Sequence, residues 1–439
     1  MSVNQNIKPL TLKRNSKGNL EVGGCDLVDL ANEYKTPLYV VDEKTLRRIL
    51  SEYREAFSSY ENLQLLYACK ACLNLSIAKI CTQEGFGFDV VSGGELYTVY
   101  KSGADMSKIV FNGSNKSIDE LKLALDLKVG RISVDNFYEL EILNELAGDR
   151  KVEILLRITP NIECHTHDYI KTGQSDSKFG FNISQIEKVV SLILNNYKNL
   201  VLKGLHAHIG SQIFELEVYK DEVDILTDEI LKIKEKFSIE LEELNIGGGA
   251  GVKYVESDEP ISIFELSKVV LEELKKSVKS KGLKFPKLYL EPGRSIISTS
   301  GITLYRLGSS KELVSGKKYV AIDGGMADNP RPSLYGAQYT AEIANKIDGK
   351  TFRKVTIVGR FCESGDVLIK DITLPEIKAG DILCVYNTGA YNYSMASNYN
   401  RVQKPAMVLV NNSQSAIIVK RENLDDIIAV DVVPERLEK

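Results

Sequence analysis

Lys70 is the residue whose type and position point most directly to covalent chemistry. It stands near the end of the apolar run LQLLYACKA, residues 63–71, which reads as a strand. A lysine there either extends its amine to solvent or lies partly buried, and partial burial lowers its pKa. A neutral amine is what Schiff-base formation with a carbonyl compound requires. Lys70 is therefore a candidate nucleophile, with a solvent-exposed lysine as the alternative.

The four histidines of the chain form two His-x-His pairs. His206 and His208 alternate along the predicted strand 201–210, so both side chains point to the same side of it. His165 and His167 form the second pair. Because His-x-His is a common pair of zinc ligands, a metal-dependent hydrolase is one hypothesis. The simpler one is that His206 and His208 are hydrogen-bonded in a barrel interior.

A phosphate-binding loop is indicated by the three glycines Gly247–Gly249, which precede a helix predicted over 261–280. Backbone without side chains lets N–H groups approach phosphate oxygens closely, although glycine runs usually form ordinary loops. Arg294 follows the next predicted strand and could donate two hydrogen bonds to the same anion. Glu291 is either a structural ion-pair partner of Arg294 or a carboxylate that keeps a pyridine nitrogen protonated.

The elements that must position these side chains alternate strand and helix, eight times. Amphipathic stretches with apolar residues three and four apart separate the strands, which is typical of helices. This repeat predicts a (β/α)8 TIM-like barrel, whose chemistry lies at the C-terminal ends of the strands. Other predicted strand ends carry Asp89, Asn112, Asp135 and Arg157. The predicted strands are 63–71, 87–92, 108–113, 131–136, 153–159, 201–210, 243–249 and 287–293.

A second domain is predicted after residue 300, where short strands joined by turns replace the helical stretches. This pattern indicates a C-terminal β domain over 301–439, either a sandwich or a second barrel. The barrel is expected over 36–300, with an extra strand at 38–42 that is not needed to close it. Residues 1–35 are too short to fold alone and are expected to join the β domain.

Composition argues against several classes of protein. The formal net charge of −4 provides no basic surface for nucleic acid or anionic membrane. The polar N-terminus lacks the apolar core of a signal peptide, and no apolar run approaches the roughly 20 residues that span a bilayer. The seven cysteines are scattered, and the Cys69–Cys72 pair has no partner pair at zinc-ribbon spacing. We therefore expect a cytoplasmic protein with free thiols.

An ordered set of motifs resembles the diaminopimelate decarboxylase family, which belongs to the fold-type-III, alanine-racemase-like enzymes that use pyridoxal phosphate. The resemblance runs from about residue 20 to 430, and the order of the motifs makes it specific. The motifs are YACKA, GFDVVSGGEL, FNGSNKS, VDN, HTHDYIKTGQSDSKFGF, GLHAHIGSQI, NIGGG, EPGRS, DGGMADNPRPSLYGA, CESGD and GAYNYSMASNYNR.

The resemblance implies pyridoxal 5'-phosphate as the cofactor. Lys70 would bind it covalently, and His208 would stack on its ring. Asp89 would support Lys70 and the ring, while Glu291 would bind the pyridine nitrogen. The phosphate would be held by Ser211, Gly248, Gly249, Gly293, Arg294 and Tyr391.

The implied reaction converts meso-2,6-diaminopimelate into L-lysine and carbon dioxide, the last step of lysine biosynthesis. The substrate end that keeps its carboxylate would be bound by Arg294, Arg331, Tyr335 and Tyr391. Glu363 would bind the amino group at that end, and Cys362 or Lys70 would return a proton to the substrate carbon. In the family Cys362 and Glu363 come from the partner subunit, which implies a head-to-tail homodimer, alone or paired into tetramers.

Two departures from the family pattern leave the assigned chemistry intact. Asn392 stands where the family usually has glycine, and Arg401–Pro405 replaces a stretch usually richer in proline and arginine. Asparagine tolerates left-handed backbone better than most residues, so the first change could be silent.

Three other functions remain as alternatives to this reaction. A decarboxylase of ornithine, arginine or a carboxylated polyamine would need an acidic site for a distal cation, against which Arg331 and Tyr335 argue. An alanine-type racemase would place arginine, not Glu291, at the pyridine nitrogen. An inactive homologue commonly lacks the lysine or the cysteine, and this chain has both Lys70 and Cys362.

Overall fold

The computed structural model describes residues 2–160, 177–345 and 351–438 and divides into two compact units. The barrel unit contains the chain up to Asn6, Arg47–Lys253 and Ser257–Ile297. The β unit contains Ile7–Leu46, Tyr254–Glu256 and the chain from Ser298 onward. None of the described helices combines the length and apolar character that a membrane crossing needs.

The barrel unit is a closed ring of eight parallel strands, which confirms the predicted (β/α)8 barrel. β13 pairs with β5, and β8 pairs with β9, so the sheet has no free edge between its first and last strands. A short ninth strand, β10 (Phe181–Asn182), lies beside β9. The barrel strands are β5 (Leu63–Ala68), β6 (Gly87–Val90), β7 (Ile109–Phe111), β8 (Arg131–Val134), β9 (Val152–Thr159), β11 (Leu200–His206), β12 (Glu243–Asn245) and β13 (Lys287–Leu290).

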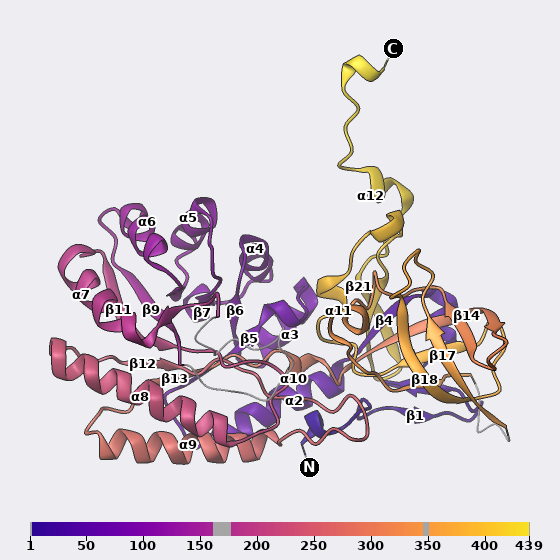
Figure 1. Ribbon diagram of the computed structural model, residues 1–439, viewed down its shortest axis with the longest axis horizontal. Helices are drawn as coiled ribbons and strands as arrows, with labels where there is room; N and C mark the ends of the chain where they lie inside the picture. The colour runs from indigo at the N-terminus through magenta and orange to yellow at the C-terminus, as the bar shows by residue number, and fades with distance from the viewer. Residues whose placement is uncertain (1, 161–176, 346–350, 439) are drawn as a thin grey trace. The chain divides into compact units, whose positions relative to one another are not determined.

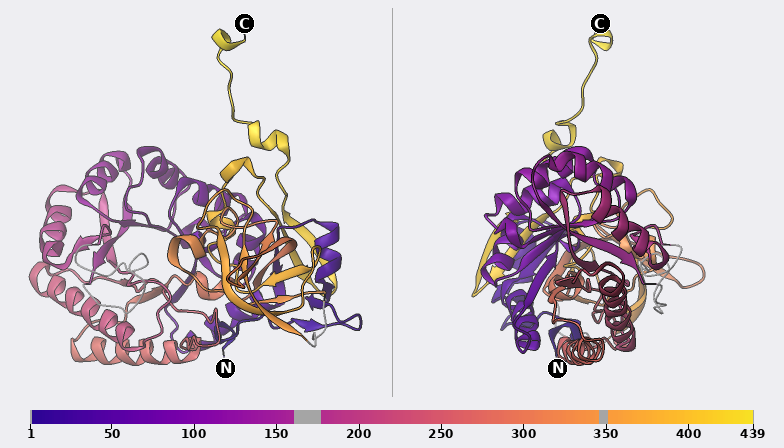
Figure 2. Two further views of the ribbon diagram at one scale, coloured as in Figure 1. Left: turned by 45° about the vertical axis from the view of Figure 1, so that its right-hand side comes forward. Right: turned by 90° about the vertical axis from the view of Figure 1, so that its left-hand side faces the viewer.

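Helices surround these strands (Figures 1 and 2). Several begin at a polar residue just after a strand, whose side chain accepts a hydrogen bond from the first helical turn, as Ser92 and Asn136 do. The helices are α2 (Glu43–Phe57), α3 (Leu75–Gln83), α4 (Gly93–Lys101), α5 (Ile118–Asp126), α6 (Phe137–Ala147), α7 (Ile186–Asn196), α8 (Glu217–Phe237), α9 (Ile263–Ser280) and α10 (Arg294–Ile297).

The barrel interior is filled by side chains. Leu66, Val110, Leu155 and Tyr289 are buried and pack together, although they come from four strands of which only β5 and β13 are neighbours. Residues on such separated strands can meet only inside the ring. The interior is therefore a packed core, and the polar strand ends above it are free to form a site.

The β unit is built on a second sheet, in the order β18-β17-β15-β14-β4-β20-β21, with β19 paired to β14 and β16 paired to β19. β4 (Leu38–Asp42) lies inside this sheet, between β14 and β20, so residues 36–46 belong here by their hydrogen bonds rather than with the barrel. The other strands are β14 (Gly301–Glu312), β15 (Lys318–Ile322), β16 (Ala341–Ile343), β17 (Phe352–Val358), β18 (Val367–Pro375), β19 (Ile382–Val385), β20 (Ala406–Asn411) and β21 (Gln414–Val419).

Shorter elements complete the β unit. An N-terminal three-stranded sheet precedes α1, and a core of buried side chains, including Val22, Leu38 and Val408, joins it to the larger sheet. These elements are β1 (Lys13–Arg14), β2 (Leu20–Val22), β3 (Cys25–Asp26), α1 (Leu27–Glu33), α11 (Arg331–Tyr335) and α12 (Leu424–Ile428).

Candidate active site

Lys70 lies in a 3-10 turn, Cys69–Ala71, directly after β5, at the C-terminal end of the barrel. The loop after β13 lies against this turn, because a Cβ on Gly293 would come within 3.0 Å of Ala68 and 3.2 Å of Ala71. The Lys70 side chain is partly buried. Its positive charge lowers the pKa values of four groups in the barrel: Asp89, Glu291, His206 and His208. The structure therefore gathers Lys70 with four of the predicted residues.

Asp89 and Glu291 are two buried carboxyl groups joined by one amide. Asn112 Nδ2 donates to Asp89 Oδ1 at 2.5 Å and to Glu291 Oε1 at 3.0 Å. A second amide, Asn245 Nδ2, donates to the same Glu291 oxygen at 2.7 Å. The sequence identifies Asn112 only as a polar strand end and does not identify Asn245 as a site residue. Their positions at the ends of β7 and β12 are the signal that could have identified them.

The two carboxyl groups have opposite pKa shifts. Burial raises the pKa of Asp89, and the neighbouring Glu291 charge raises it further, against the effects of Lys70 and Asn112. Burial also raises the pKa of Glu291, but His206, Asn245 and Lys70 outweigh it and the net shift is downward. Glu291 is thus the ionised member of the pair, and Asp89 is the one that holds a proton more readily.

Both described histidines are neutral at pH 7. Burial lowers the pKa of His206, more than the Glu291 carboxylate raises it. Its Nδ1 lies 2.7 Å from Ser133 Oγ, and its Nε2 lies 3.2 Å from Glu291 Oε2 without the geometry of a hydrogen bond. Because the ring is neutral, its effect on the Glu291 pKa operates only in acid, whereas Asn245 and Lys70 act at every pH near neutral.

His208 lies in the loop beyond β11, since the strand ends at His206 and not at the predicted residue 210. The backbone N–H of Gly248 donates to its Nδ1 at 3.3 Å. Burial and then the positive charges of Lys70 and Arg157 lower the pKa of His208 well below its usual range. An Nδ1 that accepts a hydrogen bond leaves the ring proton of the neutral form on Nε2.

The glycine loop after β12 packs closely against neighbouring loops. A Cβ on Gly248 would lie 2.3 Å from the Glu291 carbonyl oxygen, and one on Gly249 would lie 2.8 Å from the Gly210 carbonyl oxygen. Gly249 also has φ +110°, a left-handed value that disfavours other residues. The three glycines are thus required by contacts within the protein, and a phosphate that used this backbone would be an additional reason for them.

Arg294 and Ser211 connect the loops after β13 and β11. Arg294 donates to Ser211 Oγ from Nε at 3.2 Å and from Nη2 at 3.0 Å, and it is 6% exposed. The arginine opens the four-residue helix α10. The predicted phosphate-binding residues Ser211, Gly248, Gly249, Gly293 and Arg294 therefore come from three adjacent loops of the barrel unit.

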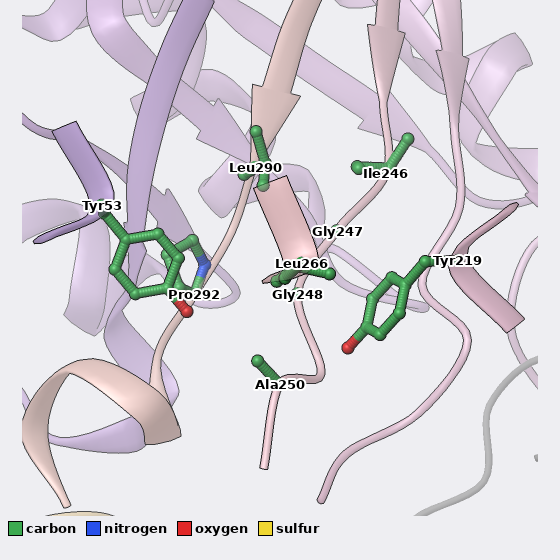
Figure 3. Close-up of a pocket in the computed structure, with 9 residues that line it drawn as sticks. All are labelled: Tyr53, Tyr219, Ile246, Gly247, Gly248, Ala250, Leu266, Leu290 and Pro292. Atoms are coloured by element: carbon green, nitrogen blue, oxygen red, sulfur yellow. The ribbon is translucent and has the colours of Figure 1, made fainter. Parts of the chain in front are cut away.

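A small cavity of about 10 Å³, room for one water molecule, lies behind the glycine loop. Figure 3 shows Tyr53 on one side and Tyr219 on the other, with Gly247 and Gly248 between them. Its walls come from β13, the loops after β12 and β13, and the helices α2, α8 and α9. The cavity is therefore between the strands and the helix layer, and it is too small to hold a substrate.

A buried ion pair that the sequence did not indicate holds the loop after β7. Lys116 Nζ lies 2.6 Å from Glu139 Oε1 and also donates to the carbonyl oxygens of Ser133 and Gly113, at 2.8 and 3.0 Å. Both side chains are almost fully buried. Because every donor of the ammonium group has a partner, the pair can stabilise this loop without any part in the chemistry.

In the β unit, Arg331 is buried at the start of α11. Its guanidinium lies 4.9 Å from the ring centre of Tyr254 and 5.7 Å from that of Tyr339. Nη1 donates to the Tyr339 hydroxyl at 2.7 Å. Within the described part of the chain, no carboxylate forms an ion pair with Arg331, which is 7% exposed. A charged group held by two rings and a hydroxyl still has donors for an anion.

The remaining predicted residues also lie in the β unit. Cys362 and Glu363 are exposed in a turn after β17, where Tyr399 Oη donates to Glu363 Oε1 at 2.7 Å. The backbone N–H of Cys362 donates to Asn400 Oδ1 at 3.2 Å. Tyr335, at the end of α11, and Tyr391, which has φ 61°, are partly buried.

Asp366, the acidic residue near Cys362 and Glu363, stabilises the turn that carries them. Asp366 is buried and accepts hydrogen bonds from the backbone N–H groups of Met326, at 2.7 Å, and Phe361, at 2.9 Å. It therefore fixes the turn that carries the exposed cysteine and glutamate.

The second His-x-His pair, His165 and His167, lies outside the described residues. Within residues 2–160, 177–345 and 351–438, no three histidine, cysteine, aspartate or glutamate side chains are grouped so that they could hold a metal ion. His206 instead contacts Ser133 and Glu291, and Lys70 and Arg157 place positive charge nearby.

Known proteins are similar to this chain over nearly its whole length. The pyridoxal binding domain of pyridoxal-dependent decarboxylases matches residues 44–298. A diaminopimelate decarboxylase of Synechocystis is 46% identical over 448 residues, covering 99% of this chain and 95% of that protein. One of Bacillus subtilis is 44% identical, covering 96% and 97%. The crystal structure of a diaminopimelate decarboxylase from M. jannaschii with L-lysine has a TM-score of 0.92 at 34% identity, covering 100% of both chains.

Proposed function

The chain belongs to the diaminopimelate decarboxylase family of pyridoxal-dependent decarboxylases, and from this membership we propose how its residues share the work. It is a pyridoxal 5'-phosphate-dependent carboxy-lyase. Its reaction converts meso-2,6-diaminopimelate into L-lysine and carbon dioxide, the last step of lysine biosynthesis. The observation that carries the substrate assignment is Arg331, a buried cation with two aromatic neighbours and no carboxylate partner among the described residues.

The residues of the barrel unit fit pyridoxal 5'-phosphate. Lys70 provides the amine that would hold it, and Arg294 with Ser211 provides cationic and hydroxyl donors for the phosphate, together with Gly248, Gly249, Gly293 and Tyr391. Glu291 accepts both of its amide hydrogen bonds at Oε1, and its Oε2 lies 3.2 Å from His206 Nε2. A buried carboxylate that stays ionised suits a protonated pyridine nitrogen.

When bound, the cofactor supplies a sink for the electrons left by the departing carbon dioxide. Glu291 favours this chemistry by remaining ionised. Asn112, which donates to both Asp89 and Glu291, holds the Glu291 side chain in position. We assign His208, neutral through burial, to the face of the ring. Cys362 Sγ or Lys70 Nζ would return a proton to the carbon that loses the carboxyl group.

Recognition of the distal end requires both signs of charge, because diaminopimelate has a second amino-acid group there. Arg331 and Arg294, with Tyr335 and Tyr391, would bind the carboxylate, since a guanidinium forms paired hydrogen bonds with that group. Glu363 would bind the ammonium. A decarboxylase of ornithine or arginine would have to place a distal cation beside Arg331, which is electrostatically unfavourable.

We further propose a homodimer in which Cys362 and Glu363 act in the partner's site. Both are exposed in the single chain although each has an assigned role in chemistry or binding. The segment from α12 onward also exposes apolar side chains that a partner would cover. They are Leu424, Ile428, Val430, Val432, Val433 and Leu437. Dimers could pair further into tetramers.

We also propose a cytoplasmic location and a role for each domain. The six cysteines that the structure describes are free thiols, which agrees with a reducing cytoplasm. The segment 36–300 would bind the cofactor, and 301–439, joined by 1–35, would provide the residues for the distal end of the substrate.

The assay that tests the reaction measures carbon dioxide and lysine released from meso-diaminopimelate, with and without added pyridoxal phosphate. Ornithine and arginine are the control substrates. We expect cofactor-dependent lysine from diaminopimelate and no product from the controls. Turnover of a control instead would contradict the roles of Arg331 and Glu363, and no turnover of any substrate by cofactor-loaded protein would favour a binding protein.

A further inference from the structure

Asn392 is a buried residue that is connected to Arg331 through the Tyr339 hydroxyl, and one end of its side-chain amide lacks a hydrogen-bond partner among the described residues. It is 0% exposed, and among the described residues its Nδ2 has no hydrogen-bond acceptor. Its Oδ1 accepts from the Tyr339 hydroxyl at 3.4 Å. A buried amide N–H without an acceptor is destabilising, so native structures rarely keep one unless a ligand or water uses it.

The orientation of the Asn392 side-chain amide follows from the hydrogen bonds that Arg331 and Tyr339 form. Arg331 has only donors, so the Tyr339 oxygen must accept from it, at 2.7 Å. The single hydroxyl proton of Tyr339 is then directed to Asn392 Oδ1. The flipped amide would instead point an N–H group at a hydroxyl oxygen that already accepts from Arg331. Nδ2 therefore points away from Tyr339.

The backbone offers no reason for asparagine at this position. Asn392 has φ −104° and ψ −71°, ordinary right-handed values, while the left-handed residue of the segment is Tyr391. Glycine, which the resembled family usually has here, would therefore fit the same backbone. The side chain must be explained by its own contacts.

We propose that Asn392 is a specificity-determining residue whose Nδ2 donates a hydrogen bond to the substrate carboxylate that Arg331 binds. This inference rests on the proposed function. Tyr339 connects the two groups, because its hydroxyl contacts both Arg331 and Asn392. All of these residues, with Tyr254, belong to the β unit. The amide would add a neutral, directional donor to the charged guanidinium and so favour a planar carboxylate over other anions.

Asn392→Asp and Asn392→Gly distinguish direct donation from an indirect effect through Tyr339. Aspartate keeps the acceptor for the Tyr339 hydroxyl but replaces the N–H donor with an oxygen that repels a carboxylate. Glycine removes both. Direct donation predicts that Asn392→Asp raises KM for diaminopimelate by on the order of 10- to 100-fold and exceeds the effect of Asn392→Gly, with kcat changed much less. If Asn392 only orients Arg331 through Tyr339, the order is reversed, and the proposal is wrong.

Inhibition by two diamines gives a measurement that a general structural defect would not reproduce. L-Lysine has the distal carboxylate, and 1,5-diaminopentane is the same molecule without it. We expect Asn392→Asp to weaken L-lysine inhibition by the same factor as KM and to leave 1,5-diaminopentane unchanged. Equal weakening of both would overturn the proposal.

A second pair of variants serves if the buried aspartate prevents folding. Tyr339→Phe removes the connecting hydroxyl but keeps Nδ2, whereas Asn392→Gly removes Nδ2. Direct donation predicts a larger KM increase for Asn392→Gly, and equal increases would contradict it. Failure of the unmodified enzyme to release lysine would instead refute the proposed function, so the two failures are distinguishable.

Discussion

The charges of two buried carboxyl groups are set by the charges and donors that each one faces. Among the described residues, Glu291 accepts from Asn112 and Asn245, while Asp89 accepts from Asn112. Lys70 lowers both pKa values, so it does not separate them; His206 and Asn245 lower the pKa of Glu291 further, and the Glu291 charge raises the pKa of Asp89. Ionised Glu291 can then stabilise a protonated ring, and Asp89 can hold a proton beside Lys70.

Replacing Lys70 tests whether this residue binds the cofactor covalently. Lys70→Ala should lose the visible absorbance of protein-bound pyridoxal phosphate and its reduction by borohydride, and turnover should fall by at least about 100-fold. The thermal midpoint should change little, because Lys70 is only partly buried. Lys101→Ala, which removes an exposed lysine of α4, is the control and should retain the absorbance. Retention of borohydride-sensitive absorbance in Lys70→Ala would refute the assignment.

Helix α8 includes a buried carboxyl group, Glu222. Glu222 is 0% exposed, and neither of its side-chain oxygens has a hydrogen-bond partner among the described residues. Burial raises its pKa well above the usual value, and the Glu291 charge adds to the shift. A raised folded-state pKa means that its contribution to stability is fully present below the unfolded pKa of about 4.3 and is lost as pH rises toward the folded value.

Replacing Glu222 with leucine should therefore stabilise the protein in a pH-dependent way. Glu222→Leu keeps most of the volume and removes the buried carboxyl, so the free energy of unfolding should rise by about 1–3 kcal/mol at pH 7 and by less near pH 4. Urea unfolding at the two pH values measures this. Glu229→Leu on the same helix is the matched control, since Glu229 is paired with Lys232 at 2.6 Å, and it should not stabilise. A gain that is the same at both pH values would show that the charge of Glu222 is not its cause.

The proposed dimer determines whether a single chain contains a complete active site. Cys362 and Glu363 are exposed in the single chain, and the turn that carries them is fixed by Asp366, Tyr399 and Asn400. A turn held rigidly at an exposed surface can position side chains for a second chain, because its own chain provides the order. A homodimer with two-fold symmetry would then contain two equal composite sites.

Mixing inactive variants tests this arrangement. Lys70→Ala and Cys362→Ala should each be inactive, but a mixed dimer has one site with both native residues. With random exchange half of the dimers are mixed, so activity should recover to about one quarter of the unmodified level. A mixture of Lys70→Ala with the double variant Lys70→Ala/Cys362→Ala is the control and should stay inactive. No recovery despite demonstrated subunit exchange would count against a site made from two chains.

Local patterns in the sequence determined the barrel, its strand order and the strand ends that meet at its C-terminal side. Period-two and period-3.6 hydrophobic repeats depend on neighbours in the chain, so Lys70, Asp89, Glu291 and Arg294 could be placed at one end of the barrel before any contact was known. The ordered motifs added the cofactor and the reaction. Strand ends were less certain, as β11 stops at His206 and leaves His208 in a loop.

Only the tertiary structure decided which groups are charged and which donors are unused. Asn112 and Glu291 are 179 residues apart, and Tyr339 and Asn392 are 53 apart, so no local pattern could show that they meet. The pKa values of Asp89 and Glu291 follow from such meetings, and so does the lack of partners for Glu222 and for the Asn392 N–H among the described residues. Burial and hydrogen bonding are properties of the packed chain, because water is excluded only when distant segments come together.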